Sequence, residues 1–212
     1  MKGKITLKAV SHSYANAHPI EFKDWEIANG EKWLLLGASG SGKTTLLHIL
    51  TGLLIPKKGE ITVDGTSLYT LKAKALDHFR GKHMGIVFQR PHLIKSLTVT
   101  ENLMLAQTFA QVPENKQRIR EVLESLDMVQ KQNAYPSALS EGQLQRVSIA
   151  RAVINKPTLL IADEPTSSLD DKNAQAVLNL LMQQTDLNNT TLVVATHDQR
   201  VKDTFSNRYE LT

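Results

Sequence analysis

The segment from Gly37 to Thr44 constrains the fold of this chain more than any other part of the sequence. It matches the pattern G-x-x-x-x-G-K-[ST] at each fixed position, between an apolar run typical of a strand and an apolar stretch typical of a helix. Glycines let the backbone turn tightly, so that successive amide groups can point at a phosphate, and a helix N-terminus adds its positive end. We expect the phosphate site to comprise Gly37, Ala38, Ser39, Gly40, Ser41, Gly42, Lys43, Thr44 and Thr45.

Two side chains of this loop have predicted roles of their own. Lys43 places a positive charge near the β- and γ-phosphates of a nucleotide, and the Thr44 hydroxyl is a ligand for Mg²⁺. A glycine-rich turn before a helix would explain the glycines but not the lysine and threonine that follow them. The loop alone leaves kinases, GTPases and motor ATPases open.

Composition describes an ordinary globular chain and excludes several classes. The chain has 212 residues, a formal charge of +4 and no cysteine, so disulfides and thiolate chemistry are absent. The charge is too small to indicate nucleic-acid binding, and the basic cluster from Lys72 to Lys82 is typical of a solvated helix face. The N-terminus lacks the apolar core of a signal peptide, and no stretch approaches a membrane span. If the protein serves a membrane, we expect another chain to supply the membrane part.

Strand-like and helix-like segments alternate along most of the chain, which predicts an α/β fold with a mainly parallel central sheet covered on both faces. We expect core regions at 1–89 and 140–212, the first with an N-terminal antiparallel β portion, and an inserted α-helical subdomain at about 90–139. The predicted strands are Ile5–Val10, Ile20–Ile27, Lys32–Leu36, Gly59–Val63, Met84–Phe88, Thr158–Ala162 and Thr190–Ala195. The predicted helices are Lys43–Leu53, Thr100–Phe109, Glu114–Leu126, Glu141–Ile154 and Asp171–Gln184.

A pair of acids ends the apolar run Leu159–Ala162. Because the carboxyl ends of parallel strands meet at one edge of a sheet, we expect Asp163 and Glu164 to lie near the phosphate loop. Asp163 can then hold Mg²⁺ through a water, and Glu164 can polarise the water that attacks the γ-phosphate. The other interpretation is that the two acids only cap the following turn.

Five further motifs occur in a set order. Leu139–Gln143 and the following Leu144–Val147 resemble the signature segment of the ABC transporter family, and Ser168–Asp170 resembles its D-loop. Gln89 matches the Q-loop glutamine, His197 the switch histidine, and Tyr14, 23 residues before Gly37, the aromatic residue that stacks on adenine. The chain therefore resembles the nucleotide-binding domain of that family, a phosphate-loop NTPase, from about Ile5 to Arg208.

The resemblance implies a composite site between two protomers, as a homo- or heterodimer that buries two ATP molecules. Ser140, Gly142 and Gln143 would face the γ-phosphate held by the partner's phosphate loop. Gln89 would join Thr44 and Asp163 at Mg²⁺, and His197 would contact the γ-phosphate. Asp170 would lie in the D-loop, and Tyr14 would stack on adenine.

Several of these residues also have simpler explanations. Ser140 and Gln143 are spaced as a capping box, so Ser140 can serve its own helix. An aromatic residue such as Tyr14 in an N-terminal strand is ordinarily core, and a histidine after a strand ordinarily forms a structural hydrogen bond. Glu141 departs from the family's usual glycine, and we expect its carboxylate to point outward. With Lys43, Glu164 and His197 present, we expect an active ATPase.

The segment after Gln89 indicates the partner. In the family this region meets a cytoplasmic helix of the transmembrane permease, so His92, Leu93 and Ile94 would be exposed contacts unless they pack within the helical insertion. Leu-Thr-Val-x-Glu-Asn at 97–102 is similar to the lipoprotein-release and macrolide-export subgroup. No further strand pair follows Arg208, which favours a compact ATPase of the exporter or mechanotransmission type. We expect a cytoplasmic location, peripheral on the inner face of the cell membrane.

Two alternatives to transport remain. An ATPase of the same type can gate a cell-envelope machine by mechanotransmission, and a partner that recruits a hydrolase instead of a many-span permease would indicate it. A soluble DNA-repair type ABC ATPase would carry a coiled coil or zinc module before the signature, and this chain has neither a sustained heptad nor cysteine there.

Overall fold

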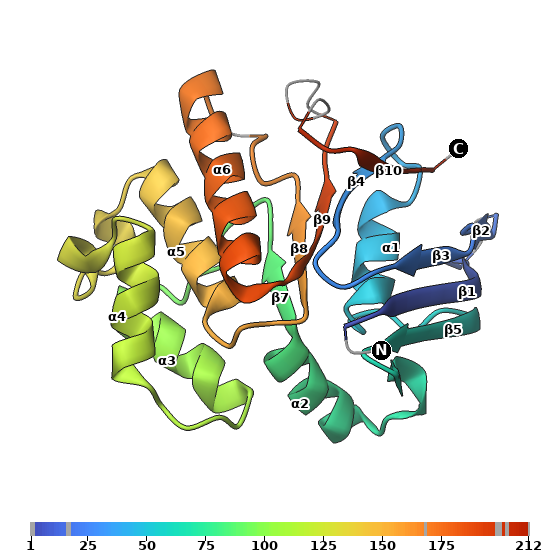
Figure 1. Cartoon of the computed structure of the whole chain (residues 1–212), viewed down its shortest axis with the longest axis horizontal. Coiled ribbons are helices and arrows are strands. Elements are labelled where there is room, and N and C mark those ends of the chain that lie inside the picture. The colour runs from blue at the N-terminus through green and yellow to red at the C-terminus, as the bar shows by residue number, and fades with distance from the viewer. Residues whose placement is uncertain (1–2, 16–17, 168, 198–200, 202–203, 212) are drawn as a thin grey trace.

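A five-stranded parallel sheet lies at the centre of the fold, with strand order β10-β4-β9-β8-β7 (Figure 1). The computed structural model describes residues 3–15, 18–167, 169–197, 201 and 204–211. The sheet consists of β4 (Lys32–Leu36), β7 (Met84–Val87), β8 (Leu159–Asp163), β9 (Thr191–Ala195) and β10 (Asn207–Glu210). Every neighbouring pair is parallel, which confirms the predicted fold class.

The sheet is buried on both faces because its strands are apolar at consecutive positions. Successive side chains of a strand point to opposite faces. In β8, Leu160 and Ala162 pack into one core cluster, whereas Leu159 and Ile161 pack into the other. A continuous apolar run is therefore what a two-sided strand requires.

Among the described residues, four helices cover one face of the sheet. They are α3 (Val99–Phe109), α4 (Lys116–Ser125), α5 (Glu141–Val153) and α6 (Asp171–Asn188). Helices α5 and α6 pack against the sheet, while α3 and α4 lie farther out (Figure 1). Between 90 and 139 the described elements are helical, with short 3₁₀ turns at Val129–Lys131 and Pro136–Ala138. The division into subdomains at these boundaries stays a prediction.

The other face is covered by α1 (Lys43–Leu50) and by an antiparallel sheet, with α2 (Ala73–His83) at its lower edge in Figure 1. The antiparallel sheet has the order β2-β1-β5-β6, and β3 also pairs with β1. Its strands are β1 (Ile5–His12), β2 (Ile20–Glu21), β3 (Trp25–Ile27), β5 (Lys58–Val63) and β6 (Thr66–Ser67). No helix among the described residues is long and apolar enough to span a membrane.

Several differences separate the predicted elements from the structure. The strand predicted at Ile20–Ile27 is interrupted, because the Asp24 carboxylate between its two halves accepts a hydrogen bond from the Ala9 amide at 2.7 Å. The first helix ends at Leu50 instead of Leu53, followed by Gly52 at a φ of 67°. Strand β10 was not predicted, and it forms by parallel pairing with β4.

Candidate functional site

The carboxyl ends of four parallel strands meet at one edge of the central sheet. Asp163 is paired with Ala195, Ala195 with Leu35, and Val87 with Ala162. The segments that follow these strands therefore leave the sheet at the same level. They are the phosphate loop after β4, Gln89 after β7, Glu164 after β8, and Thr196 with His197 after β9. This edge is where open α/β sheets bind their ligands.

The phosphate loop wraps around its own lysine. The Lys43 ammonium donates to the carbonyl oxygens of Gly37 at 2.8 Å and Ala38 at 3.1 Å. Gly42 has a φ of 99°, a conformation that favours glycine, and a Cβ there would lie 3.3 Å from Ile20. The hydroxyl of Ser41 is buried without a hydrogen-bond partner among the described residues. The loop thus contains both a hydroxyl without a partner and a cation, which suits a phosphate.

Two oxygen atoms of the kind that a hard cation prefers lie within hydrogen-bonding distance of each other at this edge. The Thr44 hydroxyl donates to Asp163 Oδ2 at 3.1 Å. Burial raises the pKa of the Asp163 carboxyl, and the neighbouring Glu164 adds to this, while the bond from Thr44 opposes it. The described residues contain no group of three or more His, Asp or Glu side chains suited to a metal. One carboxylate and one hydroxyl fit Mg²⁺, which is usually held by few protein ligands together with substrate phosphates.

Glu164 is fixed by the residues that follow β9. Its Oε1 lies 2.8 Å from His197 Nδ1, and its Oε2 accepts from the Thr196 hydroxyl at 3.0 Å and from the His197 amide at 3.4 Å. The backbone of Glu164 has a φ of 49°, an uncommon value for a residue with a side chain. Residues held in such conformations often mark functional sites.

Tyr14 reaches the phosphate-loop helix, whereas Gln89 does not reach the predicted metal ligands. The Tyr14 hydroxyl lies 3.1 Å from Thr45 Oγ1, and the ring is 50% exposed. Tyr14 is therefore not a core residue. The Gln89 amide donates to Ser167 Oγ at 3.1 Å, so in this structure it is bonded away from Thr44 and Asp163.

The signature segment forms the N-terminus of α5 with a complete capping box. The Gln143 amide donates to Ser140 Oγ at 3.3 Å, and the Ser140 amide donates to Gln143 Oε1 at 3.0 Å. Glu141 is exposed and lines a 310 Å³ pocket with Gln89 and Arg90 of the segment after β7. A Cβ on Gly142 would meet nothing closer than Asn173 Oδ1 at 3.8 Å, so there is open space on the side of this glycine where a side chain would project.

Asp170 caps the next helix. Its carboxylate accepts from the Asn173 backbone amide at 2.9 Å and from the Asn173 side chain at 2.7 Å. Because Asn173 also faces Gly142, the predicted D-loop and the signature segment lie next to each other. Ser168 of the D-loop motif is outside the described residues.

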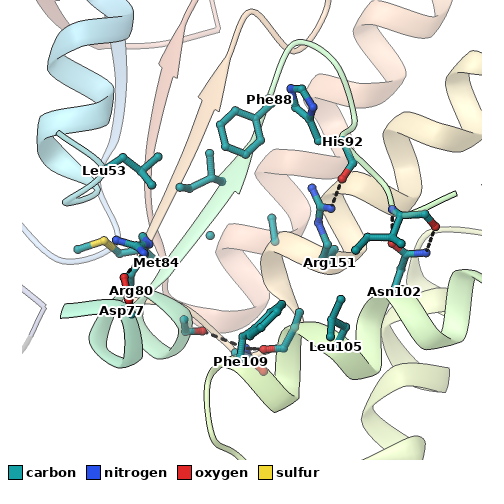
Figure 2. A pocket seen from close by; sticks show the side chains of 17 residues that line it. Leu53, Asp77, Arg80, Met84, Phe88, His92, Asn102, Leu105, Phe109 and Arg151 are labelled. Carbon is teal, nitrogen blue, oxygen red and sulfur yellow. Dashed lines mark hydrogen bonds and ion pairs between the residues drawn. The ribbon is translucent and has the colours of Figure 1, made fainter. Parts of the chain in front are cut away.

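A groove of 590 Å³ lies between the segment after β7 and the helices α2, α3 and α5 (Figure 2). It contains no residue of the phosphate loop. Exposed apolar side chains line it, with Leu53 45%, Ile94 43% and Phe109 70% exposed. His92 also lines the groove and is exposed, whereas Leu93 is half-buried and packs against the core, which is the alternative that the sequence left open for this residue.

Two polar residues hold the rim of this groove, and neither was identified from the sequence. The half-buried Arg151 guanidinium donates to the carbonyl oxygens of His92 at 2.7 Å and Pro91 at 2.9 Å. The Asn102 side chain bonds to both the amide and the carbonyl of Ile94. The available signal for Arg151 was a charged residue inside the apolar run of α5.

Fold and site together define a phosphate-loop ATPase with an inserted helical segment. The model of the family described as "ABC transporter" matches residues 21–167, and the chain belongs to the ATP-binding proteins of that family. The lipoprotein-releasing system ATP-binding protein LolD of Treponema denticola is 40% identical over 190 residues, covering 89% of this chain and 84% of that protein. The family membership confirms the predicted resemblance and the predicted ATPase activity.

Other relatives carry names from both directions of transport. The bacitracin export ATP-binding protein BceA of Halalkalibacterium halodurans is 39% identical over 82% of this chain and 70% of its own length. The methionine import ATP-binding protein MetN 2 of Enterococcus faecalis is 40% identical over 87% of this chain and 54% of its own length. A dimeric post-hydrolysis structure of the ATP-binding cassette MJ0796, bound to ADP and Pi, has a TM-score of 0.85 and 33% identity, and the match covers 98% of this chain and 94% of that one.

Proposed function

We propose that this chain is the ATP-hydrolysing subunit of a membrane transporter, working as a dimer that closes around two ATP molecules. The observation that carries the proposal is the convergence of Thr44, Asp163, Glu164 and His197 at one sheet edge beside the phosphate loop. The dimeric cassette with ADP and Pi supports the same arrangement for a relative.

The catalytic roles follow from the positions of the groups. Lys43 and the loop amides bind the β- and γ-phosphates, and Tyr14 stacks on adenine. Thr44 and Asp163, with Gln89 after a side-chain rotation, would hold Mg²⁺, which neutralises phosphate charge. Glu164 polarises a water whose oxygen attacks the γ-phosphorus as the bond to ADP breaks. His197 orients Glu164 and contacts the γ-phosphate.

Closure of the dimer would be completed by the N-terminus of α5. Ser140, Gly142 and Gln143 would face the γ-phosphate of ATP bound to the partner subunit, where a helix N-terminus favours an anion. Asp170 lies beside them through Asn173 and would be part of the same interface. Glu141 lines a pocket together with the chain's own Arg90, and in the closed dimer its carboxylate would stay in this pocket and away from the phosphate.

The groove is the proposed docking site for a cytoplasmic helix of a transmembrane permease. An exposed groove lined by Leu53, Ile94 and Phe109 suits the apolar face of a helix. The chain would then lie peripherally at the cytoplasmic face of the membrane. Similarity to the lipoprotein-releasing protein favours export or extraction as the work performed.

The experiment that tests the proposal combines hydrolysis with co-purification from membranes. We expect Mg²⁺-dependent release of phosphate from ATP, ATP-dependent dimerisation, and recovery of a many-span membrane protein with the tagged chain. Recovery of a partner that recruits a cell-wall hydrolase would overturn the proposed role in transport. Absence of phosphate release would overturn the catalytic assignment.

A further inference from the structure

Tyr14 is held on two sides in this structure. The rings of His12 and Tyr14 meet edge to face, with centroids 4.9 Å apart and planes at 75°. On the other side the Tyr14 hydroxyl lies 3.1 Å from Thr45 Oγ1, at the start of the phosphate-loop helix. Exposed side chains ordinarily hop between rotamers within nanoseconds. These two contacts fix the orientation of the Tyr14 ring, although Tyr14 is 50% exposed.

The packing of β1 does not by itself explain why residue 12 is a histidine. His12 is 6% exposed, and its Nδ1 is buried with no hydrogen-bond partner among the described residues. The other buried positions of β1 are the apolar Ile5, Leu7 and Val10. A buried nitrogen without a partner is less favourable than an apolar side chain of similar shape. Of the described contacts of His12, the one that depends on a flat ring at this position is the contact with Tyr14.

We propose that His12 is a positioning residue for Tyr14, and that it sets the angle at which the Tyr14 ring receives a purine base. This inference rests on the proposed role of Tyr14 in stacking on adenine. Edge-to-face aromatic pairs constrain orientation in a way that an aliphatic neighbour does not. His12 therefore contributes to the part of the affinity that comes from the base, and not to the part that comes from the phosphates.

Calorimetric titration with ATP and with inorganic triphosphate, both with Mg²⁺, separates these two parts. His12→Leu keeps an apolar side chain without a ring, and His12→Phe keeps a flat ring. We expect His12→Leu to weaken ATP binding by roughly two- to tenfold, the range an aromatic pair contributes, and to leave triphosphate binding unchanged. His12→Phe should bind ATP with the affinity of the wild type. Thermal unfolding identifies folded variants, and His12→Gln serves as the ringless variant if His12→Leu does not fold.

A double-mutant cycle tests whether His12 acts through Tyr14. In a Tyr14→Ala background, His12→Leu should produce no further loss of ATP affinity. Equal ATP affinity of the wild type and His12→Leu would overturn the inference, and so would an equal loss for triphosphate or an additive loss in the double variant. If Tyr14→Ala leaves ATP affinity unchanged, the role of Tyr14 itself fails. If Tyr14→Ala weakens ATP binding and His12→Leu does not, only the role of His12 fails.

Discussion

The carboxylate of Glu164 and the imidazole of His197 are in direct contact, with Oε1 of the glutamate 2.8 Å from Nδ1 of the histidine. Thr196 holds the other carboxylate oxygen at 3.0 Å. A carboxylate has about four lone-pair sites, two on each oxygen, and the His197 amide also donates to the oxygen that Thr196 holds, so Oε1 is the oxygen that can still accept a hydrogen bond from a water. The proposed base is thus oriented before the nucleotide arrives, and His197 and Thr196 fix where an attacking water can bind.

Glu164→Gln is expected to abolish turnover while retaining ATP-dependent dimerisation. The amide keeps the shape of the side chain but is a poor base, so phosphate release should fall by at least about a hundredfold. Phosphate release and analytical ultracentrifugation measure the two properties separately. Glu124→Gln makes the same chemical change on α4, within an exposed ion pair with Arg120, and should behave as the wild type. Unchanged turnover in Glu164→Gln would rule out this glutamate as the catalytic base.

Asp163→Asn should make the nucleotide-free chain more stable at neutral pH. The pKa of Asp163 is raised above its ordinary value of 3.8, mainly by burial, so the folded chain binds this proton more tightly than the unfolded chain. Its contribution to the free energy of unfolding therefore falls as pH rises from about 3.8 through the raised pKa.

Chemical denaturation of both proteins across this pH range measures the effect. The stability difference should be largest near neutral pH and shrink towards pH 4. With ATP and Mg²⁺ present the order should reverse, because the variant lacks the carboxylate for the metal. A nucleotide-free Asp163→Asn chain that is less stable than the wild type at pH 7 would contradict the burial argument.

Ser140→Asp separates the two interpretations of the signature serine. Aspartate is as good an N-cap as serine, so α5 should keep its stability, whereas Ser140→Ala should lose roughly 1 kcal/mol. A carboxylate facing the partner's γ-phosphate would repel it. We expect Ser140→Asp, combined with Glu164→Gln, to prevent ATP-dependent dimerisation in ultracentrifugation. If this double variant dimerises as tightly as Glu164→Gln alone, Ser140 only caps α5 and does not contact the partner's γ-phosphate.

Phe109→Ser should weaken binding of the chain to the proposed permease without affecting ATP binding. Burying a phenyl ring contributes roughly 1.5–3 kcal/mol, so recovery of the permease with the tagged chain should fall about tenfold or more. Leu187→Ser is the matched control, since Leu187 is 66% exposed on α6 and does not line the groove. Equal loss in both variants would indicate a general effect of surface polarity, and no loss in Phe109→Ser would exclude the groove as the docking site.

The central strands could be predicted from sequence because their burial on two faces requires continuous apolar runs. Lys32–Leu36 was located to the residue, since a turn precedes it and the phosphate loop follows it. Strand β10 lacks such a run, and of its residues only Tyr209 is buried. Its strand conformation comes from hydrogen bonding to β4, which is a property of the assembled sheet.

The identities of the site residues were accessible from motifs, but their contacts were not. Tyr14 and Thr45 are far apart in sequence, and nothing in either neighbourhood indicates that their hydroxyls meet. Gln89 has the family position, yet in this structure it bonds to Ser167. Such contacts depend on which loops the sheet edge brings together, and a local pattern does not encode that arrangement.

The bonds from Arg151 end on the main chain of Pro91 and His92 and not on their side chains. A carbonyl oxygen is present whatever residue occupies the position, so substitutions along this rim leave the attachment to α5 in place. If the proposed docking site is correct, the side chains at positions 91 and 92 can change to suit a different membrane partner while the link to α5, the helix that Ser140 caps, stays in place.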